Sequence, residues 1–214
     1  MRENKPNKEK KYLVPGPAGV LETLIFKQNT QENQSGQAIL AIVCHPHPLF
    51  HGSMEHKIVT TALKAFQELG FNTLRFNFRG VGESQGHFAQ GNGEQKDLQA
   101  IMAWAKHQGF EAFILAGFSF GSYVSAKVAG NNPAVKKLIS IAPPMHHFDF
   151  YSIEKVHCPW LLIQGSEDEI VAVDLVKEWS NSTAQTHELI WFEGVGHFFH
   201  GQLIPLKQAI QNFL

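Results

Sequence analysis

The sequence has little net charge. Its 214 residues include 18 lysines and arginines against 19 aspartates and glutamates, which leaves a formal net charge of −1 at pH 7. Proteins that bind nucleic acid or anionic membranes usually present a strongly basic surface, and this balance does not provide one. We therefore expect no nucleic-acid partner and no membrane partner. With 43% hydrophobic and only 17% charged residues, the chain is able to bury a large core.

Cysteines and long hydrophobic runs are also scarce. The two cysteines, Cys44 and Cys158, each lie beside a predicted buried strand, so small buried side chains are the simpler interpretation. A disulfide between them is the alternative. No run approaches the roughly 18 apolar residues that a membrane-spanning helix needs. The lysine-rich N-terminus also lacks the apolar core of a signal peptide. These absences predict a soluble, cytoplasmic protein.

The sequence does contain a regular alternation of strand and helix patterns. Apolar segments predict strands at residues 20–26, 38–44, 71–78, 111–117, 136–144, 158–165 and 187–194. Helical spacing of apolar residues predicts helices at residues 54–70, 94–109, 122–133 and 173–181 and at the C-terminus. This alternation predicts a doubly wound α/β fold with a mostly parallel sheet of about seven or eight strands and helices on both faces. Residues 1–11 are expected to form a flexible N-terminus, and residues 12–214 a single domain.

A serine interrupts one apolar segment at the point where the next helix begins. Ser119 stands in "GFSFG", with Gly117 and Gly121 two residues to either side. Ligands of open α/β sheets bind at the carboxyl ends of the strands. A serine at a sharp strand-to-helix turn needs small neighbours, because strand and helix crowd each other there. The pattern G-x-S-x-G therefore predicts a nucleophile at a helix N-terminus, and a chance match without function is the alternative.

A serine nucleophile needs a base to remove its proton and an acid to orient that base. In this type of fold the acid and the histidine follow the serine in that order, each after a later strand. Asp168 and His197 follow the last two predicted strands and meet this requirement. Glu167 and Glu169 compete for the role of the acid. The spacing G-x-x-D-x-x-V in "GSEDEIV" favours Asp168.

Together these motifs resemble the α/β-hydrolase superfamily, over roughly residues 12–214. "GFSFG", "GSEDEIV" and "GVGHFF" resemble its nucleophile, acid and histidine segments, and "FNFRGVGES" resembles a turn that follows a central strand in many such enzymes. "CHPHPLFHGS" resembles the HPHP-type loop of small bacterial hydrolases related to dienelactone hydrolase. The resemblance implies a triad of Ser119, His197 and Asp168 that needs no cofactor. Dienelactone hydrolase itself has a cysteine where this chain has Ser119, so its substrate does not transfer directly.

Acyl transfer also needs hydrogen-bond donors for the oxygen that becomes negatively charged. One expected donor is the N–H of Phe120, the residue after the nucleophile. The second is expected in the HPHP-type loop, where Pro46 and Pro48 have no N–H to donate. His47 and Leu49 are then the nearest candidates, and the resemblance favours Leu49.

The histidines of the same loop raise the alternative of a metal site. His45, His47 and His51 lie close together in the sequence, but no H-E-x-x-H or similar ligand pattern accompanies them. We therefore predict no metal.

The expected site is open, because the segment that usually carries the superfamily's lid is short. That segment, "PPMHHFDFYSIEKVH", is too short for a helical cap domain. We predict that four residues at the rim bind the substrate: Phe50, Met145, Phe148 and Phe198.

The leading prediction is a serine hydrolase that cleaves small carboxylic esters or thioesters through an acyl-enzyme. Acyl transfer to an acceptor other than water, or amide cleavage, would use the same triad. The remaining alternatives are a non-catalytic binding module with this fold and a metal-dependent hydrolase. The expected partner is a small-molecule ester, and the sequence leaves the oligomeric state open.

Overall fold

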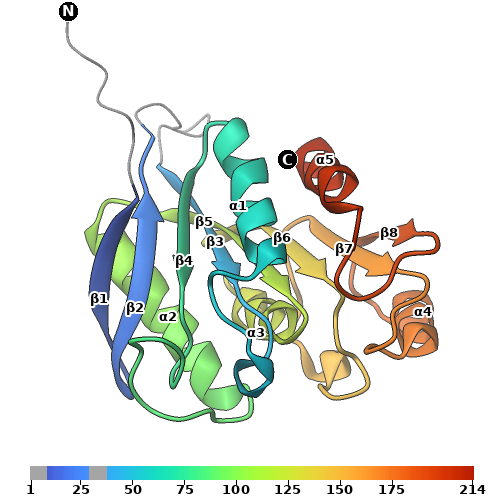
Figure 1. The fold of residues 1–214 in the computed structure, drawn as a ribbon, viewed down its shortest axis with the longest axis horizontal. Coiled ribbons are helices and arrows are strands. Elements are labelled where there is room, and N and C mark those ends of the chain that lie inside the picture. The colour runs from blue at the N-terminus through green and yellow to red at the C-terminus, as the bar shows by residue number, and fades with distance from the viewer. Residues whose placement is uncertain (1–8, 29–37) are drawn as a thin grey trace, which may run out of the picture.

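An open eight-stranded sheet runs through the described part of the chain, residues 9–28 and 38–214 of the computed structural model (Figure 1). Its strands are β1 (Lys10–Gly16), β2 (Gly19–Phe26), β3 (Ile39–Cys44), β4 (Asn72–Phe76), β5 (Ala112–Phe118), β6 (Val135–Ile141), β7 (Trp160–Gly165) and β8 (Glu188–Phe192). Their order in space is β1-β2-β4-β3-β5-β6-β7-β8. The pairs β1–β2 and β2–β4 are antiparallel, and the other neighbouring strands are parallel.

Helices cover both faces of the sheet. They are α1 (Lys57–Glu68), α2 (Asn92–His107), α3 (Phe120–Ala129), α4 (Val173–Ser182) and α5 (Leu203–Phe213), with short 3-10 turns η1 (Pro48–Phe50) and η2 (Phe150–Ser152). Side chains alternate along β3, so Leu40 and Ile42 join the core beneath α2, α3 and α4. Ala41 and Val43 join the core beneath α1 and α5. These two helices lie on the face of the sheet opposite α2, α3 and α4 (Figure 1). The predicted doubly wound α/β fold is confirmed, with all seven predicted strands and all five helices.

β1 overlaps the segment that was predicted to be flexible. Residues 1–8 lie outside the described residues, but the strand already begins at Lys10, two residues before the predicted start of the domain. The ammonium group of Lys11 reaches Glu22 of β2, with Nζ 2.7 Å from Oε1. Pro15 is tolerated because β1 is an edge strand, where a missing N–H breaks no ladder bond on the open side. Pairing with β2 therefore orders residues 10 and 11, although their polar composition predicts a flexible terminus.

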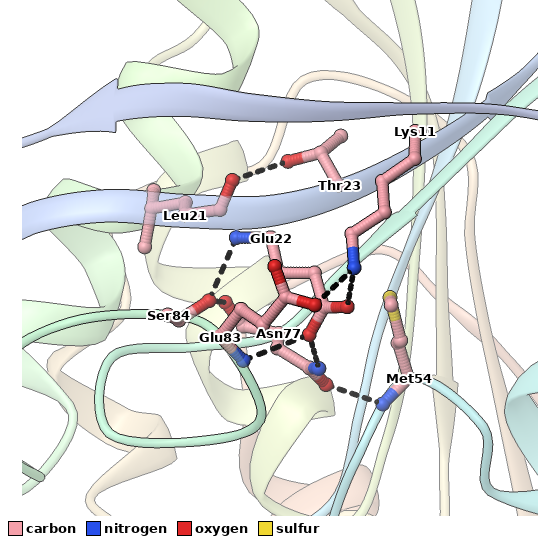
Figure 2. A network of polar contacts seen from close by, with 8 residues as sticks. All are labelled: Lys11, Leu21, Glu22, Thr23, Met54, Asn77, Glu83 and Ser84. Carbon is pink, nitrogen blue, oxygen red and sulfur yellow. Dashed lines mark hydrogen bonds and ion pairs between the residues drawn. The ribbon is translucent and has the colours of Figure 1, made fainter.

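A polar network fixes the loop that follows β4 (Figure 2). The Glu22 carboxylate accepts hydrogen bonds from Asn77 Nδ2 at 2.8 Å and from the Glu83 N–H at 3.0 Å. Asn77 Oδ1 accepts the N–H of Met54 at 2.9 Å, and Ser84 Oγ donates to the Asn77 carbonyl at 2.7 Å. Because Met54 lies between β3 and α1, the network joins the loop after β3 to the loop after β4 at the carboxyl edge of the sheet.

Arg79 anchors the same loop to α2. Its Nε and Nη2 donate to the two carboxylate oxygens of Asp97 at 2.9 and 2.7 Å, and Nη2 also donates to the Gly93 carbonyl at 2.8 Å. The Asp97 side chain is fully buried, and the guanidinium neutralises its charge there. This bidentate pair is a structural contact.

Within the two described ranges, no helix combines the length and apolar character needed to cross a membrane.

Candidate active site

Ser119 occupies a sharp turn between β5 and α3, as predicted. Its backbone has φ 51° and ψ −120°, a conformation that costs a non-glycine residue about 1–3 kcal/mol. A Cβ added to Gly117 would lie 2.2 Å from the carbonyl carbon of Gly121, and one added to Gly121 would lie 2.4 Å from the carbonyl oxygen of Cys44 in β3. Both obstacles are backbone atoms, so neither site admits a side chain. The close packing of β3, β5 and α3 therefore requires the two glycines of "GFSFG".

The first turn of α3 locks this serine in place. Ser119 donates its N–H to the Ile141 carbonyl at 2.8 Å, and its own carbonyl accepts the N–H and Oγ–H of Ser122 at 2.8 and 2.6 Å. These bonds involve the backbone of Ser119, which leaves its hydroxyl available to substrate. Phe120 is the first residue of α3, so its N–H has no acceptor within the helix.

His197 and Asp168 lie in the loops after β8 and β7 and are hydrogen bonded to each other. His197 Nδ1 donates to Asp168 Oδ2 at 2.8 Å. A carboxylate only accepts, so this bond places the ring proton on Nδ1 and leaves Nε2 able to take up a proton. Asp168 Oδ1 accepts the N–H groups of Ile170 and Val171 at 2.9 and 2.7 Å, and Gln164 Nε2 donates to Oδ2 at 2.9 Å.

These hydrogen bonds keep the Asp168 carboxylate ionised in a buried position. Burial acts to raise the pKa of Asp168, but the hydrogen bonds from His197, Val171 and Gln164 outweigh it and leave the pKa below its usual value. The competing glutamates take other roles. Glu169 Oε2 accepts the backbone N–H of His197 at 3.0 Å, and the backbone N–H of Glu167 donates to the loop after β8. Of these acids, Asp168 is the one that contacts the imidazole ring.

A cavity of about 320 Å³ lies at the carboxyl edge of the sheet, and Ser119 and His197 both line it. Phe50, Phe148 and Phe198, three of the four predicted substrate-binding residues, line it too. Met145 does not: it packs against the core and borders a neighbouring hollow that shares Phe148 with the main cavity. Met145 lies in the loop after β6, as Phe148 does, but it packs against the core.

Several residues that were not predicted as site residues also line the cavity, among them His56, His146, His147 and Ile170. The rings of His146 and His147 are 3.8 Å apart between centroids, and burial lowers the pKa of His146. Their position in the sequence could have indicated the histidine pair and Ile170, because they follow β6 and β7 at the same edge of the sheet. His56 comes from the N-terminus of α1, which the sequence alone does not place at the site.

In the loop after β3, the backbone N–H of Leu49, the predicted oxyanion donor, already has a hydrogen-bond partner. It donates to His47 Nδ1 at 3.2 Å, the Leu49 side chain is 67% exposed, and Leu49 does not line the cavity. His47 does line the cavity. His45 is buried, where Nδ1 donates to the Pro46 carbonyl at 2.6 Å and Nε2 accepts the N–H of Phe78 at 2.9 Å. Within the part of the chain that the structure describes, no three potential metal-binding side chains converge.

Known proteins share this architecture. A family model described as "alpha/beta hydrolase fold" matches residues 47–154. The chain belongs to the α/β-hydrolase family. It is similar to the structure of an α/β serine hydrolase homologue from Coxiella burnetii, with 44% identity and a TM-score of 0.89 over 96% of this chain and 97% of the other.

Two further proteins are similar to this α/β hydrolase over most of its length. A structure from Xanthomonas campestris, described as a serine hydrolase without a lid, has 40% identity and a TM-score of 0.87 over 98% of this chain and 94% of the other. An uncharacterised protein from Rickettsia prowazekii is 34% identical and covers 93% of this chain and 86% of its own length. Between β6 and β7, the present α/β hydrolase likewise has no lid, because that segment contains only η2.

Proposed function

We propose that this α/β hydrolase is a serine hydrolase that cleaves small carboxylic esters or thioesters through an acyl-enzyme. The observation that carries the proposal is the His197–Asp168 hydrogen bond of 2.8 Å beside the cavity that Ser119 also lines. The serine hydrolase homologues from C. burnetii and X. campestris support the same class of chemistry.

In the proposed reaction, Ser119 Oγ attacks the carbonyl carbon and His197 Nε2 accepts the hydroxyl proton. The tetrahedral intermediate then collapses, the bond to the leaving group breaks, and His197 returns the proton to the departing oxygen or sulfur. A water molecule, deprotonated by His197, then attacks the acyl carbon. The bond to Ser119 Oγ breaks, the acid is released, and His197 returns the proton to Oγ. Asp168 keeps the imidazole in the Nδ1–H tautomer and stabilises the imidazolium that forms in each half-reaction.

The oxyanion of both intermediates needs two N–H donors, and we assign them to Phe120 and His47. Phe120 is the first residue of α3, so its N–H has no acceptor within the helix. Leu49, the donor favoured by the sequence, already donates to His47 Nδ1. Pro46 and Pro48 have no N–H, and among the described residues the His47 N–H has no acceptor. Losing one such donor typically raises the barrier by about 3 kcal/mol.

The decisive experiment combines covalent labelling with kinetics. A fluorophosphonate probe should label Ser119, identified by mass spectrometry of the labelled peptide. Ser119→Ala and His197→Ala should each lower kcat on 4-nitrophenyl esters by roughly 10⁴–10⁶, and the double variant should lose little more, because the two groups act as one unit. Ser182→Ala, which alters a serine at the end of α4, is the matched control and should retain full activity.

The outcomes separate the proposal from its alternatives. Absence of labelling together with absence of turnover would favour a non-catalytic binding module. Turnover that survives in Ser119→Ala and stops on addition of a chelator would indicate metal-dependent hydrolysis. Formation of new esters or amides in the presence of added alcohols or amines would indicate acyl transfer from the same intermediate.

A further inference from the structure

Two histidines of the segment between β3 and α1 share an unusual role in the backbone. His47 precedes η1, and its Nδ1 accepts the N–H of Leu49 at 3.2 Å. His56 precedes α1, and its Nδ1 accepts the N–H of Ile58 at 3.3 Å. Both imidazoles therefore serve as N-terminal caps, a position usually held by serine, threonine, aspartate or asparagine. Both residues also line the cavity that Ser119 lines.

The capping bonds determine where each ring carries its proton. A backbone N–H is only a donor, so Nδ1 must be unprotonated and the neutral ring carries its hydrogen on Nε2. Burial lowers the pKa of both histidines, that of His56 to about 4, so both rings are neutral near pH 7. Among the described residues, neither Nε2–H has a hydrogen-bond acceptor within the protein.

Aromatic packing holds both rings against the cavity wall. The His56 ring stacks on Phe118 at 5.0 Å between centroids, and Phe118 also contacts the His197 ring at 4.9 Å. The His47 ring contacts Phe120 at 5.2 Å. The His56 and His47 rings therefore pack against Phe118 and Phe120, the residues on either side of Ser119 in the chain. This packing restricts the movement of both rings.

The rest of the cavity lining limits the charge of a ligand. Apart from histidines and Ser119, its walls consist of phenylalanine, proline and isoleucine side chains. Among the described residues, no lysine or arginine lines it, so a carboxylate on the substrate would have no lysine or arginine partner in the lining itself. The ammonium group of Lys57 lies over the ring of Phe198, at 5.8 Å from its centroid. A ligand without any acceptor would also be unfavourable, because it would displace water and leave the two Nε2–H groups unpaired.

We propose that His47 and His56 determine specificity by donating hydrogen bonds from Nε2 to an uncharged ester that carries a further oxygen acceptor, such as an ether, hydroxyl or ketone. This inference rests on the proposed ester hydrolysis at Ser119. Sites built to hydrogen bond a substrate group discriminate strongly against analogues that lack it. Uncharged, oxygen-bearing esters are therefore the substrate class that this cavity favours over plain alkanoates and over monoesters of dicarboxylic acids, which carry a carboxylate.

Isosteric esters test the proposal by exchanging one methylene for one oxygen. In the acyl series, 4-nitrophenyl hexanoate is compared with its 3-, 4- and 5-oxa analogues. In the alcohol series, hexyl butanoate is compared with 2-propoxyethyl butanoate. Each kcat/KM is divided by the rate of alkaline hydrolysis of the same ester, which removes intrinsic reactivity. The wild-type enzyme should prefer at least one oxa ester over its carbon isostere by roughly fivefold or more.

The variants identify the donors. His56→Asn and His47→Asn keep an N-cap acceptor for the helix but withdraw the Nε2–H from the cavity. Each should reduce the oxa preference, and the double variant should abolish it, while activity on 4-nitrophenyl hexanoate reports any general damage. His157→Asn replaces a histidine that does not line the cavity and should keep the wild-type preference. A wild-type preference for the carbon isosteres throughout, or an oxa preference that survives in the double variant, would overturn the proposal.

A binding measurement separates this inference from the proposed reaction. The uncharged amides hexanamide and 5-oxahexanamide are titrated into Ser119→Ala and followed by the ¹⁵N shifts of the histidine rings. Tighter binding of the oxa amide with a shift at Nε2 of His47 or His56 supports the donors, even if no ester is turned over and the hydrolase proposal fails. Equal binding with no Nε2 shift, alongside a working hydrolase, rejects the donors and leaves the reaction intact.

Discussion

Acid destabilisation through His45 is a prediction that the structure allows us to quantify. The imidazole is fully buried between the ends of β3 and β4, where its Nε2 accepts the N–H of Phe78 at 2.9 Å and Nδ1 donates to the Pro46 carbonyl at 2.6 Å. Burial is the main cause that lowers the pKa of His45, to about 4 from an ordinary value of 6.5. Protonation of Nε2 would also place a hydrogen against the Phe78 N–H and break that bond.

The direction and size of this change in stability follow from proton binding to His45 in the folded and unfolded states. Between pH 6.5 and pH 4 the unfolded chain protonates this histidine and the folded protein does not, so stability falls as the pH falls through this window. At pH 5, which is 1.5 units below the ordinary pKa and above the folded value, the loss is about 2 kcal/mol, because one unit corresponds to about 1.4 kcal/mol. Above pH 7 both states are neutral at this position and the contribution disappears.

Urea unfolding of wild type and His45→Gln between pH 5 and pH 8.5 measures this effect. The glutamine amide retains an acceptor for Phe78 but does not titrate. Between pH 7.5 and pH 5 the wild type should lose about 2 kcal/mol more than the variant, because all other titrating groups are shared. Above pH 7 the two stability curves should run parallel, which serves as the internal control. Equal losses in the two proteins would refute a neutral, buried His45.

Three other predictions follow from the geometry. Asp168→Asn should fold normally but lower kcat for ester hydrolysis by about 10⁴. An amide favours the wrong tautomer of His197 and does not stabilise its imidazolium form. Gly121→Ala should lower the unfolding free energy by about 1–3 kcal/mol, although alanine usually stabilises helices, because its Cβ meets the Cys44 carbonyl; a urea curve at or above wild type would contradict this. Arg79→Met should cost about 3–5 kcal/mol by leaving the buried Asp97 carboxylate unpaired, and Asp97→Asn in the same background should recover part of it.

The differences between prediction and structure have local causes. β1 was missed because Lys10, Lys11 and Pro15 are poor strand formers. Antiparallel pairing with β2, the ion pair between Lys11 and Glu22 and the edge position make them acceptable there. We propose His47 in place of Leu49 as the second oxyanion donor because the Leu49 N–H already donates to His47 Nδ1, a contact that the resemblance does not show.

The sequence alone predicted the order of the strands along the chain and the two glycines around Ser119. It also predicted that Asp168 and His197 follow later strands. Each of these features obeys a general rule of strand patterns, turns or this fold class. Strand period and turn sterics act within a few residues, and the common carboxyl edge of parallel strands is a general rule of this fold class. The cavity's histidines obey no such rule. His56 belongs to a helix N-terminus and His146 to an irregular loop, and only the packing of α1, β5 and β6 brings them to one wall. Side-chain direction and hydrogen-bond partners depend on long-range contacts, so tertiary structure alone decided what the cavity presents to a substrate.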